Sequence, residues 1–429
     1  MRNAKTIAIS ALLSLSILAP TGAAAELPKN AEGVAKGSET YRQLGRFASV
    51  FDEVRRNHVD DTEDAKLVEN ALKGMLSGLD PHSAYLPPED AAMLTSETKG
   101  SFGGLGIEIA PDEGAVRVVA PIDDSPAAKA GIRTGDRILR VAGIPVREIG
   151  HDEAVRKMRG KPGSEVTVTV ERDGKTFDKT IVRAVIVVPA AKGRIEKDVA
   201  VVRLSRFSEN AAERLREEIE LLDKEKPLGW ILDLRSNPGG LLDQAVAVAG
   251  LFVAKGEIVS VRGRGGVVQS SRSVKGTDVL RGAPLVVLID GGSASASEIV
   301  AGALRDHKRA TLVGTTTFGK GSVQSVIGLN DGSAVKLTTG RYYTPAGVSI
   351  QGDGLKPDVE IHKKGREIKG GTEGRLTGAL GKSNGERIRR ETPETEATKT
   401  RDEKEVGEEK GDPQLDKAVE IVRERKKKK

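Results

Sequence analysis

The chain has 429 residues, a formal net charge of +6 at pH 7 and no cysteine. Without cysteine it forms no disulfide, carries no thiol nucleophile and takes no lipid through cysteine. Arg2, Lys5 and the four lysines Lys426–Lys429 account for the whole charge excess, and the near-neutral remainder argues against a nucleic-acid-binding body.

The first 25 residues have the pattern of a secretory signal peptide. A basic start, Met1–Lys5, precedes an apolar run, Ile7–Ala19, that falls short of the ~20 residues a bilayer span needs. Small residues, Ala23–Ala25, then precede Glu26. The pattern predicts cleavage after Ala25 and export to the periplasm or the cell envelope, with an uncleaved membrane anchor as the alternative.

Residues 26–99 are predicted to form a helical region. Apolar side chains recur there at helical spacing in two groups, Phe47, Val50, Phe51 and Val54, then Val68, Ala71, Leu72, Met75 and Leu76. A turn-rich link follows at Gly78–Pro88. Its His82 is predicted to be a hydrogen-bonded turn residue rather than a catalytic base.

The periodicity changes at Gly100, and residues 100–187 contain a succession of short strands. The elements follow in the order of a glycine-rich loop at Gly103–Ile109, a strand at Val116–Val119, a helix through Asp152–Met158, a strand at Gly163–Glu171 and a turn at Asp173–Gly174. This order resembles that of a PDZ domain, which is an α+β module. An ordinary glycine-rich hairpin is the alternative.

In PDZ domains the backbone N–H groups of the glycine-rich loop hold the C-terminal carboxylate of a peptide, which adds as a strand to the edge of the sheet. The resemblance assigns these N–H groups to Leu105, Gly106 and Ile107. It implies partners that are polypeptides with accessible C-termini.

Residues 188–362 alternate between apolar strands and amphipathic helices. Strands are predicted at Val199–Leu204, Gly229–Leu234, Pro284–Asp290, Ala310–Val313, Val335–Thr338 and Gly340–Tyr343, and helices at Ala211–Leu222 and Leu241–Leu251. Such alternation indicates an α/β core with parallel strand pairings.

A serine-rich segment stands where one of these strands turns into a helix. Gly292–Leu304 begins with Ser293, Ser295 and Ser297, and continues with apolar residues three and four apart. At such a turn, free N–H groups and the positive end of the helix dipole can receive a developing oxyanion. The alternative is a capping box, in which Ser295 is the N-cap residue and Glu298 reaches back to it; the two interpretations are compatible.

Lys320 follows Ser295 by 25 residues and lies between Gly319 and Gly321. A serine hydroxyl needs a base, and the histidines show no triad spacing, whereas burial can lower the pKa of a lysine from about 10.4 by several units. Gln324 can hold the amine only if the intervening segment is coiled or helical, because four residues of strand would separate them by roughly 13 Å. The alternative is a solvated turn lysine.

Asn237–Gly240 follows a buried strand and opens a helix, so its glycine N–H groups are expected to be available in a tight turn. Together with the N–H of Ala296 they can form an oxyanion hole. The same string is also common in ordinary turns, which is the alternative.

After His362 the chain contains no aromatic residue, and Gly, Glu, Lys, Arg and Thr dominate up to Asp412. This composition cannot offset the entropy of ordering, so residues 363–411 are predicted to be a disordered charged linker. Residues 412–429 are predicted to form a helix that docks on the body or on a partner subunit, from the helical spacing of Leu415, Ala418, Val419 and Val422. The basic tip is interpreted as a solubilising tail, with weak contact to anionic membrane or cell wall as the alternative.

Several motifs together resemble the C-terminal processing peptidases, also called tail-specific proteases, over about Tyr41 to Pro357. In chain order they are Leu79–Tyr85, the PDZ elements, Asn237–Gly240, Ser293–Glu298 and Phe318–Gly321. Specific motifs in the order typical of one family make the resemblance strong.

The resemblance implies that Ser295 is the nucleophile, Lys320 the general base and Gln324 the residue that orients the lysine. It implies that Gly239 and Ala296 donate to the oxyanion, and that no metal or cofactor takes part. It also implies a multidomain fold in which a PDZ domain is inserted beside an α/β peptidase core like those of crotonases and Clp proteases. The polar insert before the terminal helix departs from the family, which puts a role of this helix in dimerisation in doubt.

The sequence therefore predicts an exported serine endopeptidase that recognises protein C-termini through its PDZ domain and cleaves through an acyl-enzyme. One alternative is a non-catalytic PDZ scaffold on a degenerate peptidase fold, although no catalytic residue is missing. Another is a histidine-dependent PDZ protease of the heat-shock type, which needs a Gly-Asn-Ser-Gly-Gly string that this chain lacks. An adaptor protein and a second copy of the chain stay open as partners.

Overall fold

The structure is a computed structural model that describes residues 39–122, 124–187, 189–362, 372–376, 378–381 and 411–427. The predicted signal peptide lies outside these residues. The chain divides into two compact units, Met1–Asn70 and Ala71–Lys429. No helix within the described ranges is long and apolar enough to cross a membrane.

The described part of the first unit is helical, as predicted. It contains α1 (Glu39–Asn57) and the start of α2 (Asp64–Ser77). α1 buries none of its residues, and the side chains of Leu44, Phe47 and Val50 are 57%, 51% and 58% exposed. The apolar spacing therefore correctly predicted a helix, but its apolar side chains are not covered by other described residues.

The second unit is built around a six-stranded sheet with the order β10–β11–β12–β15–β16–β19. Its strands are β10 (Ala191–Glu196), β11 (Val199–Leu204), β12 (Trp230–Asp233), β15 (Leu285–Ile289), β16 (Thr311–Gly314) and β19 (Val359–Glu360). β10 pairs antiparallel with β11, and all the other neighbours are parallel. The predicted α/β core with parallel pairings is confirmed.

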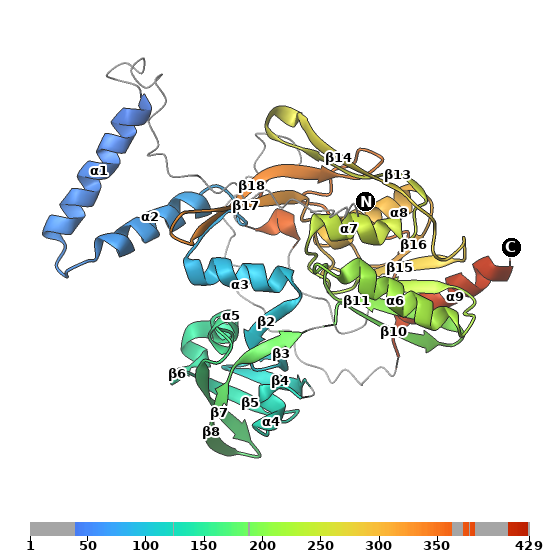
Figure 1. The fold of residues 1–429 in the computed structure, drawn as a ribbon, viewed down its shortest axis with the longest axis horizontal. Coiled ribbons are helices and arrows are strands. Elements are labelled where there is room, and N and C mark those ends of the chain that lie inside the picture. The colour runs from blue at the N-terminus through green and yellow to red at the C-terminus, as the bar shows by residue number, and fades with distance from the viewer. Residues whose placement is uncertain are drawn as a thin grey trace, which may run out of the picture. The chain divides into compact units, whose positions relative to one another are not determined.

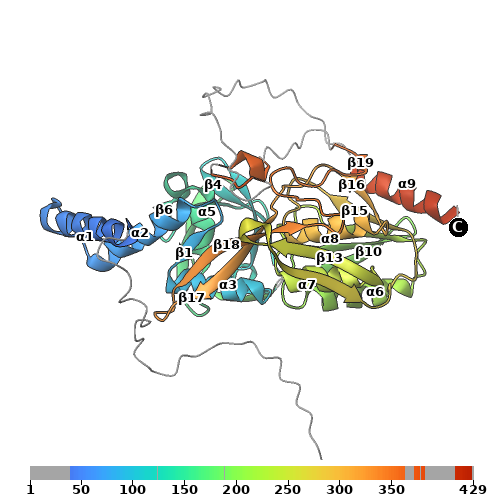
Figure 2. The same ribbon diagram turned by 90° about the horizontal axis from the view of Figure 1, so that it is seen from above.

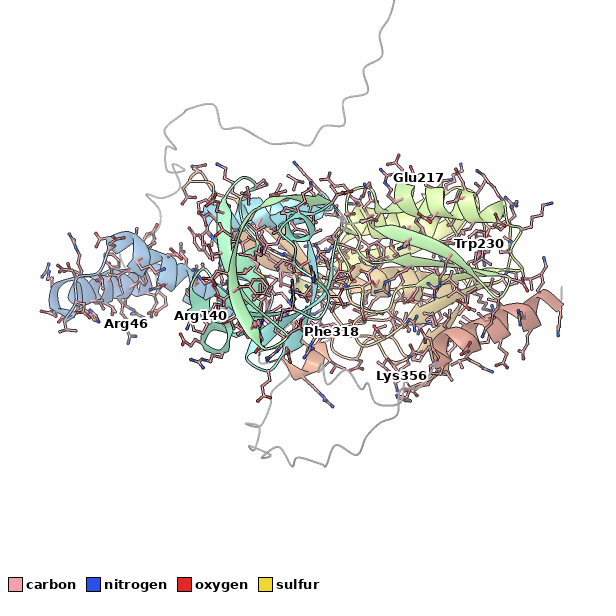
Figure 3. All side chains as sticks on the ribbon, turned by 90° about the horizontal axis from the view of Figure 1, so that it is seen from below. Arg46, Arg140, Glu217, Trp230, Phe318 and Lys356 are labelled. Atoms are coloured by element: carbon pink, nitrogen blue, oxygen red, sulfur yellow. The ribbon has the colours of Figure 1, made fainter. Side chains whose placement is uncertain are left out.

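Helices cover both faces of this sheet, as Figures 1 and 2 show. They are α6 (Ala211–Asp223), α7 (Leu242–Gly250) and α8 (Ala296–Asp306) on one face, and α9 (Pro413–Lys427) on the other. Along β11, Val202 packs toward the first three helices and Val201 toward α9, because successive strand residues face opposite sides. Figure 3, which shows the molecule from below, labels the exposed Glu217 on α6 and the buried Trp230 on β12.

A second sheet, with the order β1–β18–β13–β14, has β17 paired to β18 as well. Its strands are β1 (Ala84–Leu86), β13 (Lys255–Arg262), β14 (Val268–Lys275), β17 (Ser322–Gly328) and β18 (Ala334–Tyr343). Only β18 was predicted, and as two shorter strands. The sheet joins segments far apart in the chain, since β1 from the turn-rich link pairs with β18.

Residues 101–187 form the PDZ-like part of the unit. Its sheet runs β3–β4–β5–β7–β8, with β6 paired to β5 and with β2 and β9 as a separate pair. The elements are β2 (Ser101–Gly104), β3 (Ile107–Asp112), β4 (Ala115–Pro121), α4 (Pro126–Lys129), β5 (Arg137–Val141), β6 (Ile144–Pro145), α5 (Val146–Met158), β7 (Glu165–Arg172), β8 (Lys175–Val182) and β9 (Ala184–Val187). β7 and β8 are joined by the predicted turn, whose residues Asp173 and Gly174 have φ of 51° and 73°. α3 (Pro88–Thr98) precedes this part.

The segment predicted to be a disordered linker contains an ordered stretch, and the prediction is wrong there. Residues 372–376 and 378–381, which we name the strap, pack against the rest of the second unit through Glu373 and Ala379, both fully buried. Arg341 Nε donates to Gly381 O at 2.9 Å. The prediction used the average composition of a long segment, in which the few residues that become buried do not stand out. Residues 363–371, 377 and 382–410 lie outside the described residues.

The terminal helix α9 docks on the body of its own chain, which was one of the two predicted outcomes. Its start is tied to the end of β12, where Arg235 Nη1 lies 2.8 Å from Asp412 Oδ2 and 3.1 Å from Gln414 Oε1. Arg235 also holds Asp233, with Nη2 at 2.7 Å from Oδ2. The helix therefore braces the strand end that leads into the Asn237–Gly240 turn.

Candidate active site

Ser295 occupies a strained turn between β15 and α8. Its φ of 55° and ψ of −112° lie outside the regions that residues other than glycine ordinarily adopt. This conformation places the serine at the start of α8, beside the N–H of Ala296, which has no acceptor among the described residues, whereas the N–H groups of Ser297 and Ile299 are already paired. Strained serines at strand-to-helix turns are typical of hydrolase nucleophiles.

The three serines of this segment differ in their surroundings. Ser293 is buried, and its hydroxyl donates to Leu234 O at 2.8 Å; buried Ser297 donates to Asn237 O at 2.9 Å. Ser295 is half-buried, and its hydroxyl donates no hydrogen bond within the described residues. Ser295 is therefore the serine of the three whose proton is open to an added base or substrate.

Glu298 connects the serine turn to the lysine loop, which is residues 317–321. The predicted capping box is present, with the Ser295 N–H donating to Glu298 Oε2 at 2.8 Å. The same carboxylate accepts the Lys320 N–H at 2.9 Å on Oε2 and the Gly319 N–H at 2.8 Å on Oε1. Sequence reasoning recognised the cap but missed this bridge, since it spans a loop whose fold the sequence does not specify.

Glu298 is fully buried, and burial raises its pKa to about 7. Hydrogen bonds from the Thr317 hydroxyl and from the backbone N–H groups of Ser295, Gly319 and Lys320 act in the opposite direction, because they favour the carboxylate. A buried carboxyl group at the junction of the serine and lysine segments therefore titrates near neutral pH.

Lys320 is half-buried, and the pKa of its amine is lowered. Burial is the larger cause and the positive charge of Lys336 on β18 the second; Glu373, Glu298 and Asp80 act in the opposite direction. Its ammonium forms no hydrogen bond or ion pair with the residues that the structure describes. A lysine in such a position can be neutral and can accept a proton.

Gln324 does not hold Lys320 in this structure. Its amide donates to Ser322 Oγ at 2.9 Å and to Thr338 Oγ1 at 3.4 Å. β17 begins at Ser322, so the segment is extended where the predicted contact required coil or helix, despite a bulge between Val323 and Gln324. The orienting contact expected from the sequence is therefore absent among the described contacts.

The Asn237–Gly240 turn lies against the serine, but its N–H groups differ from the expectation. A Cβ built on Gly239 would be 2.9 Å from Ser295 Cβ, so the two residues are in contact. The Gly239 N–H, however, donates to Asn237 Oδ1 at 2.9 Å and is not available in this state. The N–H groups of Gly240 and Ala296 have no acceptor within the described ranges.

The Gly239 carbonyl accepts the Phe207 N–H at 3.0 Å. A trans peptide points its N–H away from its C=O, so the Gly240 N–H points away from Phe207. Gly240, one of the two glycines of the predicted turn, is therefore a candidate oxyanion donor beside Ala296, although the resemblance had singled out Gly239.

The turn-rich link before β1 adds to the lysine side of the site. Asp80 accepts hydrogen bonds from the Ser83 hydroxyl at 2.6 Å, the His82 N–H at 2.9 Å and the Thr338 hydroxyl at 3.0 Å. Burial opposes ionisation of Asp80, but these hydrogen bonds outweigh it and its pKa is lowered. The predicted turn role of His82 is confirmed, and its ring Nε2 lies 2.8 Å from Glu373 Oε2.

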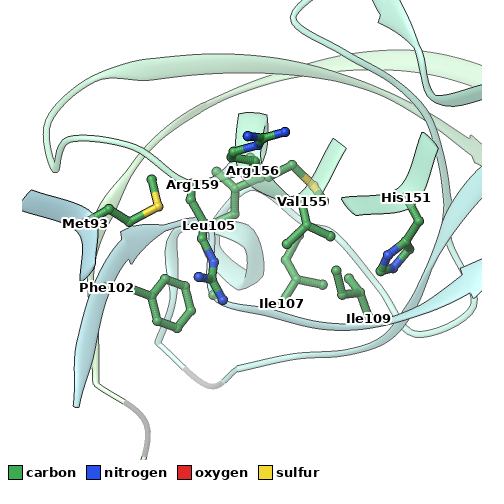
Figure 4. A pocket seen from close by; sticks show the side chains of 11 residues that line it. Met93, Phe102, Leu105, Ile107, Ile109, His151, Val155, Arg156 and Arg159 are labelled. Carbon is green, nitrogen blue, oxygen red and sulfur yellow. The ribbon is translucent and has the colours of Figure 1, made fainter. Parts of the chain in front are cut away.

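The PDZ-like part carries an apolar cavity of about 550 Å³ along its glycine-rich loop. Figure 4 shows Leu105, Ile107 and Ile109 along one wall, with His151 and Val155 of α5 opposite them. The cavity lining is completed by Met93, Phe102, Gly106, Arg156, Met158 and Arg159. The structure thus brings together the predicted carboxylate-binding loop and a pocket for an apolar side chain.

The loop geometry directs N–H groups out of the domain body. Leu105 O accepts the Ala127 N–H and Gly106 O accepts the Ile122 N–H, both at 2.9 Å. The N–H groups of Gly106 and Ile107, each opposite one of these carbonyls in a trans peptide, therefore point away from the body. Gly106 has φ of 74°, and a Cβ there would lie 2.4 Å from Ser125 Cβ, so the loop requires glycine.

Comparisons with known proteins agree with this geometry. Residues 198–361 match Peptidase family S41, residues 103–181 match the PDZ domain, and residues 14–90 match the activating protease CtpB N-terminal domain. A carboxy-terminal-processing protease of Bartonella bacilliformis is 48% identical over 330 residues, or 76% of this chain and 76% of the relative. Carboxy-terminal processing protease CtpA of Bacillus subtilis is 37% identical over 322 residues, or 74% of this chain and 69% of the relative.

Among solved structures, the photosystem II D1 C-terminal processing protease is 31% identical, with a TM-score of 0.48 over 73% of this chain and 92% of that one. Fold and site together define a serine-type peptidase that carries a PDZ domain. The chain belongs to the carboxy-terminal-processing protease family.

Proposed function

We propose that this chain is an exported endopeptidase that cleaves by a serine–lysine mechanism, with Ser295 as nucleophile and Lys320 as general base. The observation that carries the proposal is the shared carboxylate of Glu298, which binds the backbone N–H groups of both residues. A strained, half-buried serine and a lysine of lowered pKa are thereby held at one site.

Each step follows from the protonation states these surroundings favour. Neutral Lys320 accepts the Ser295 proton as Oγ bonds to the scissile carbonyl carbon, and the oxyanion is received by the N–H groups of Ala296 and Gly240. The carbon–nitrogen bond breaks as the lysine returns its proton to the leaving amine. Water gives a proton to Lys320 as its oxygen bonds to the acyl carbon; the bond from that carbon to Ser295 Oγ then breaks, Lys320 returns the proton to Oγ, and the acid is released.

Gly239 and Gln324 enter this scheme only after a local change. Gly239 must exchange its bond to Asn237 for one to the oxyanion, and Gln324 must leave Ser322 and Thr338 to reach the amine. Substrate binding supplies new hydrogen bonds at this site, and catalytic contacts often tighten only in the complex. Both residues therefore keep their proposed roles as members of the bound state.

The PDZ-like part supports a substrate class of polypeptides with free, apolar C-termini. Outward N–H groups of Gly106 and Ile107 suit a carboxylate, and the apolar cavity suits the last side chain. The export of the chain rests on the pattern of residues 1–25. An adaptor, a homo-oligomer and a contact of the basic tip with anionic surfaces are further proposals from the sequence.

The test is cleavage of an unfolded polypeptide with an apolar C-terminus by the wild type, Ser295→Ala and Lys320→Ala. We expect activity to disappear in both variants, and a serine-directed sulfonyl fluoride to label Ser295 of the wild type by mass spectrometry. Ser293→Ala and Ser297→Ala are controls: each loses a buried hydrogen bond worth about 1–3 kcal/mol of stability but keeps the chemistry. Full cleavage by Ser295→Ala would move the nucleophile elsewhere, and no cleavage by the wild type would favour a PDZ scaffold.

A further inference from the structure

The strap lies against the lysine loop although it follows the peptidase core in the chain. The match to Peptidase family S41 ends at residue 361, and the strap begins at residue 372. Its first part is a short 3-10 helix, Glu373–Arg375. A segment from beyond the core therefore contributes to the surroundings of Lys320.

Hydrogen bonds join the strap to the lysine loop on both sides of Lys320, one through backbone atoms and one through the Gln351 side chain. The Glu373 N–H donates to Phe318 O at 2.8 Å. Gln351 spans the other end: its Oε1 accepts the Gly321 N–H at 3.0 Å, and its Nε2 donates to Glu373 Oε1 at 3.2 Å and to Leu380 O at 3.1 Å. Glu373 thus connects to residues on either side of Lys320.

The side chain of Glu373 is a buried carboxylate that a distant residue secures. It is 1% exposed, and His82 Nε2 lies 2.9 Å from Oε1 and 2.8 Å from Oε2. His82 is itself held, since its N–H donates to Asp80 Oδ1. A carboxylate buried to this degree needs such partners, because an unpaired buried charge is costly.

The charged groups around Lys320 come from separate elements. Lys336 faces it from β18, Glu298 from α8, Asp80 from the link before β1 and Glu373 from the strap. Each of the three carboxylates is fixed by hydrogen bonds to backbone or side-chain donors. The strap therefore supplies one of three anchored negative charges that favour the protonated lysine.

We propose that Glu373 is a positioning residue for catalysis: with His82 it fixes the strap, and the strap holds the loop that carries Lys320 against the serine turn. Besides the Glu298 carboxylate, a direct backbone hydrogen bond links that loop to the serine turn, from the Phe318 N–H to Ser293 O at 3.0 Å. Glu373 holds the carbonyl of the same residue. The inference rests on the serine–lysine mechanism proposed above.

The experiment measures kcat and KM across pH for the full chain and its variants Glu373→Ala, Glu373→Gln and Arg375→Ala. Glu373→Ala removes the link to His82 and Gln351, and we expect the high-pH plateau of kcat to fall about tenfold to a hundredfold, with KM little changed. Arg375→Ala is the matched control, since Arg375 lies on the same 3-10 turn with an exposed side chain. Its kcat, KM and pH profile should equal those of the wild type.

Glu373→Gln keeps the shape and removes the charge. The carboxylate favours the ammonium form of Lys320, so its loss lowers the pKa of Lys320 further, and the rising limb of kcat/KM moves to lower pH. A residue with a merely structural role would leave this limb in place. In the double variant His82→Ala/Glu373→Ala we expect kcat no lower than in Glu373→Ala, because the two residues act as a unit.

The inference is overturned if the high-pH plateau of kcat is unchanged in Glu373→Ala, or if the rising limb of kcat/KM does not move in Glu373→Gln. If Glu373→Ala fails to fold, the limb of Glu373→Gln decides alone. The serine–lysine mechanism is scored separately by Ser295→Ala and Lys320→Ala in the same assay. If Ser295→Ala and Lys320→Ala lose activity while Glu373→Ala keeps the pH profile of the wild type, the positioning role of Glu373 is rejected and the serine–lysine mechanism is retained.

Discussion

The two sides of the candidate active site are built in different ways. The serine side is one continuous segment, from β15 through the strained turn at Ser295 into α8. The lysine side is assembled from Asp80, Gln351 and Glu373, which lie on three separate segments, and from Glu298 of α8, which both sides share. A nucleophile can be set by local backbone geometry, whereas the state of a lysine base depends on what the whole fold places around it.

The largest effect is expected when the proposed base, Lys320, is replaced by a residue that cannot become neutral. Lys320→Arg keeps the charge, but a guanidinium stays protonated, so we expect kcat to fall by about 10²–10⁴. The measurement is steady-state cleavage at several pH values. The control is Lys356→Arg, an exposed lysine (labelled in Figure 3) at which the same change should have no effect. Retained activity in Lys320→Arg would place the base elsewhere.

The next effect tests the bridge between the two sides. Glu298→Gln replaces one carboxylate oxygen by an amide NH₂, so either Ser295 and Lys320 or Gly319 lose the acceptor of their backbone N–H groups and the serine turn or the lysine loop must shift. A displacement of about 1 Å can cost a hundredfold, and we expect a fall in kcat of about that size. The matched control is Glu220→Gln, an exposed residue of α6. If Glu298→Gln kept the kcat of the wild type and lost only thermal stability, Glu298 would act only as a helix cap.

A change far from both sides should alter binding alone. Val155→Glu puts a negative charge in the apolar PDZ cavity, where it opposes both an apolar side chain and a carboxylate. We expect KM for substrates with apolar C-termini to rise about tenfold, the scale of one lost apolar contact, with kcat unchanged. Val182→Glu, on exposed β8, is the control. Equal KM values in the two variants would show that this cavity does not bind the substrate.

The smallest effect concerns stability and pH. Burial raises the pKa of Glu298 from 4.5 to about 7, so the folded state binds this proton more tightly than the unfolded state. The contribution is fully present below pH 4.5 and is lost as pH rises through about 7. Urea unfolding of the wild type and Glu298→Gln should therefore show wild-type stability declining relative to the variant over that interval. A constant difference would mean that the carboxylate titrates alike in both states.

Local patterns in the sequence predicted the serine side well. The apolar run before the glycines became β15, and the spacing after them became α8 with its capping box. The choice of Ser295 among the three serines rested on resemblance. The structure adds a physical reason for this choice, since the hydroxyl groups of Ser293 and Ser297 donate to backbone carbonyls. These features are local, so short-range pattern and turn chemistry suffice to find them.

The lysine side was predicted less completely. β13, β14 and β17 were missed, and with them the extended path that separates Gln324 from the expected contact with Lys320. Glu298 was recognised as a cap but not as a bridge, and Glu373 lay inside a segment predicted to be disordered. The contacts of Glu298 and Glu373 join residues far apart in sequence, for which a single chain gives no local signal.

The sequence alone determined most helices and parallel strands of the core and the PDZ-like order of elements, and it singled out Ser295 and Lys320 as the candidate catalytic pair. These properties follow from periodicity, turn residues and motifs that a few neighbouring residues carry. Only the tertiary structure decided which N–H groups stay free for an oxyanion, which carboxylates surround Lys320 and where the strap docks. Hydrogen-bond partners and burial are set by packing between distant segments, and they fix the protonation state on which the proposed chemistry depends.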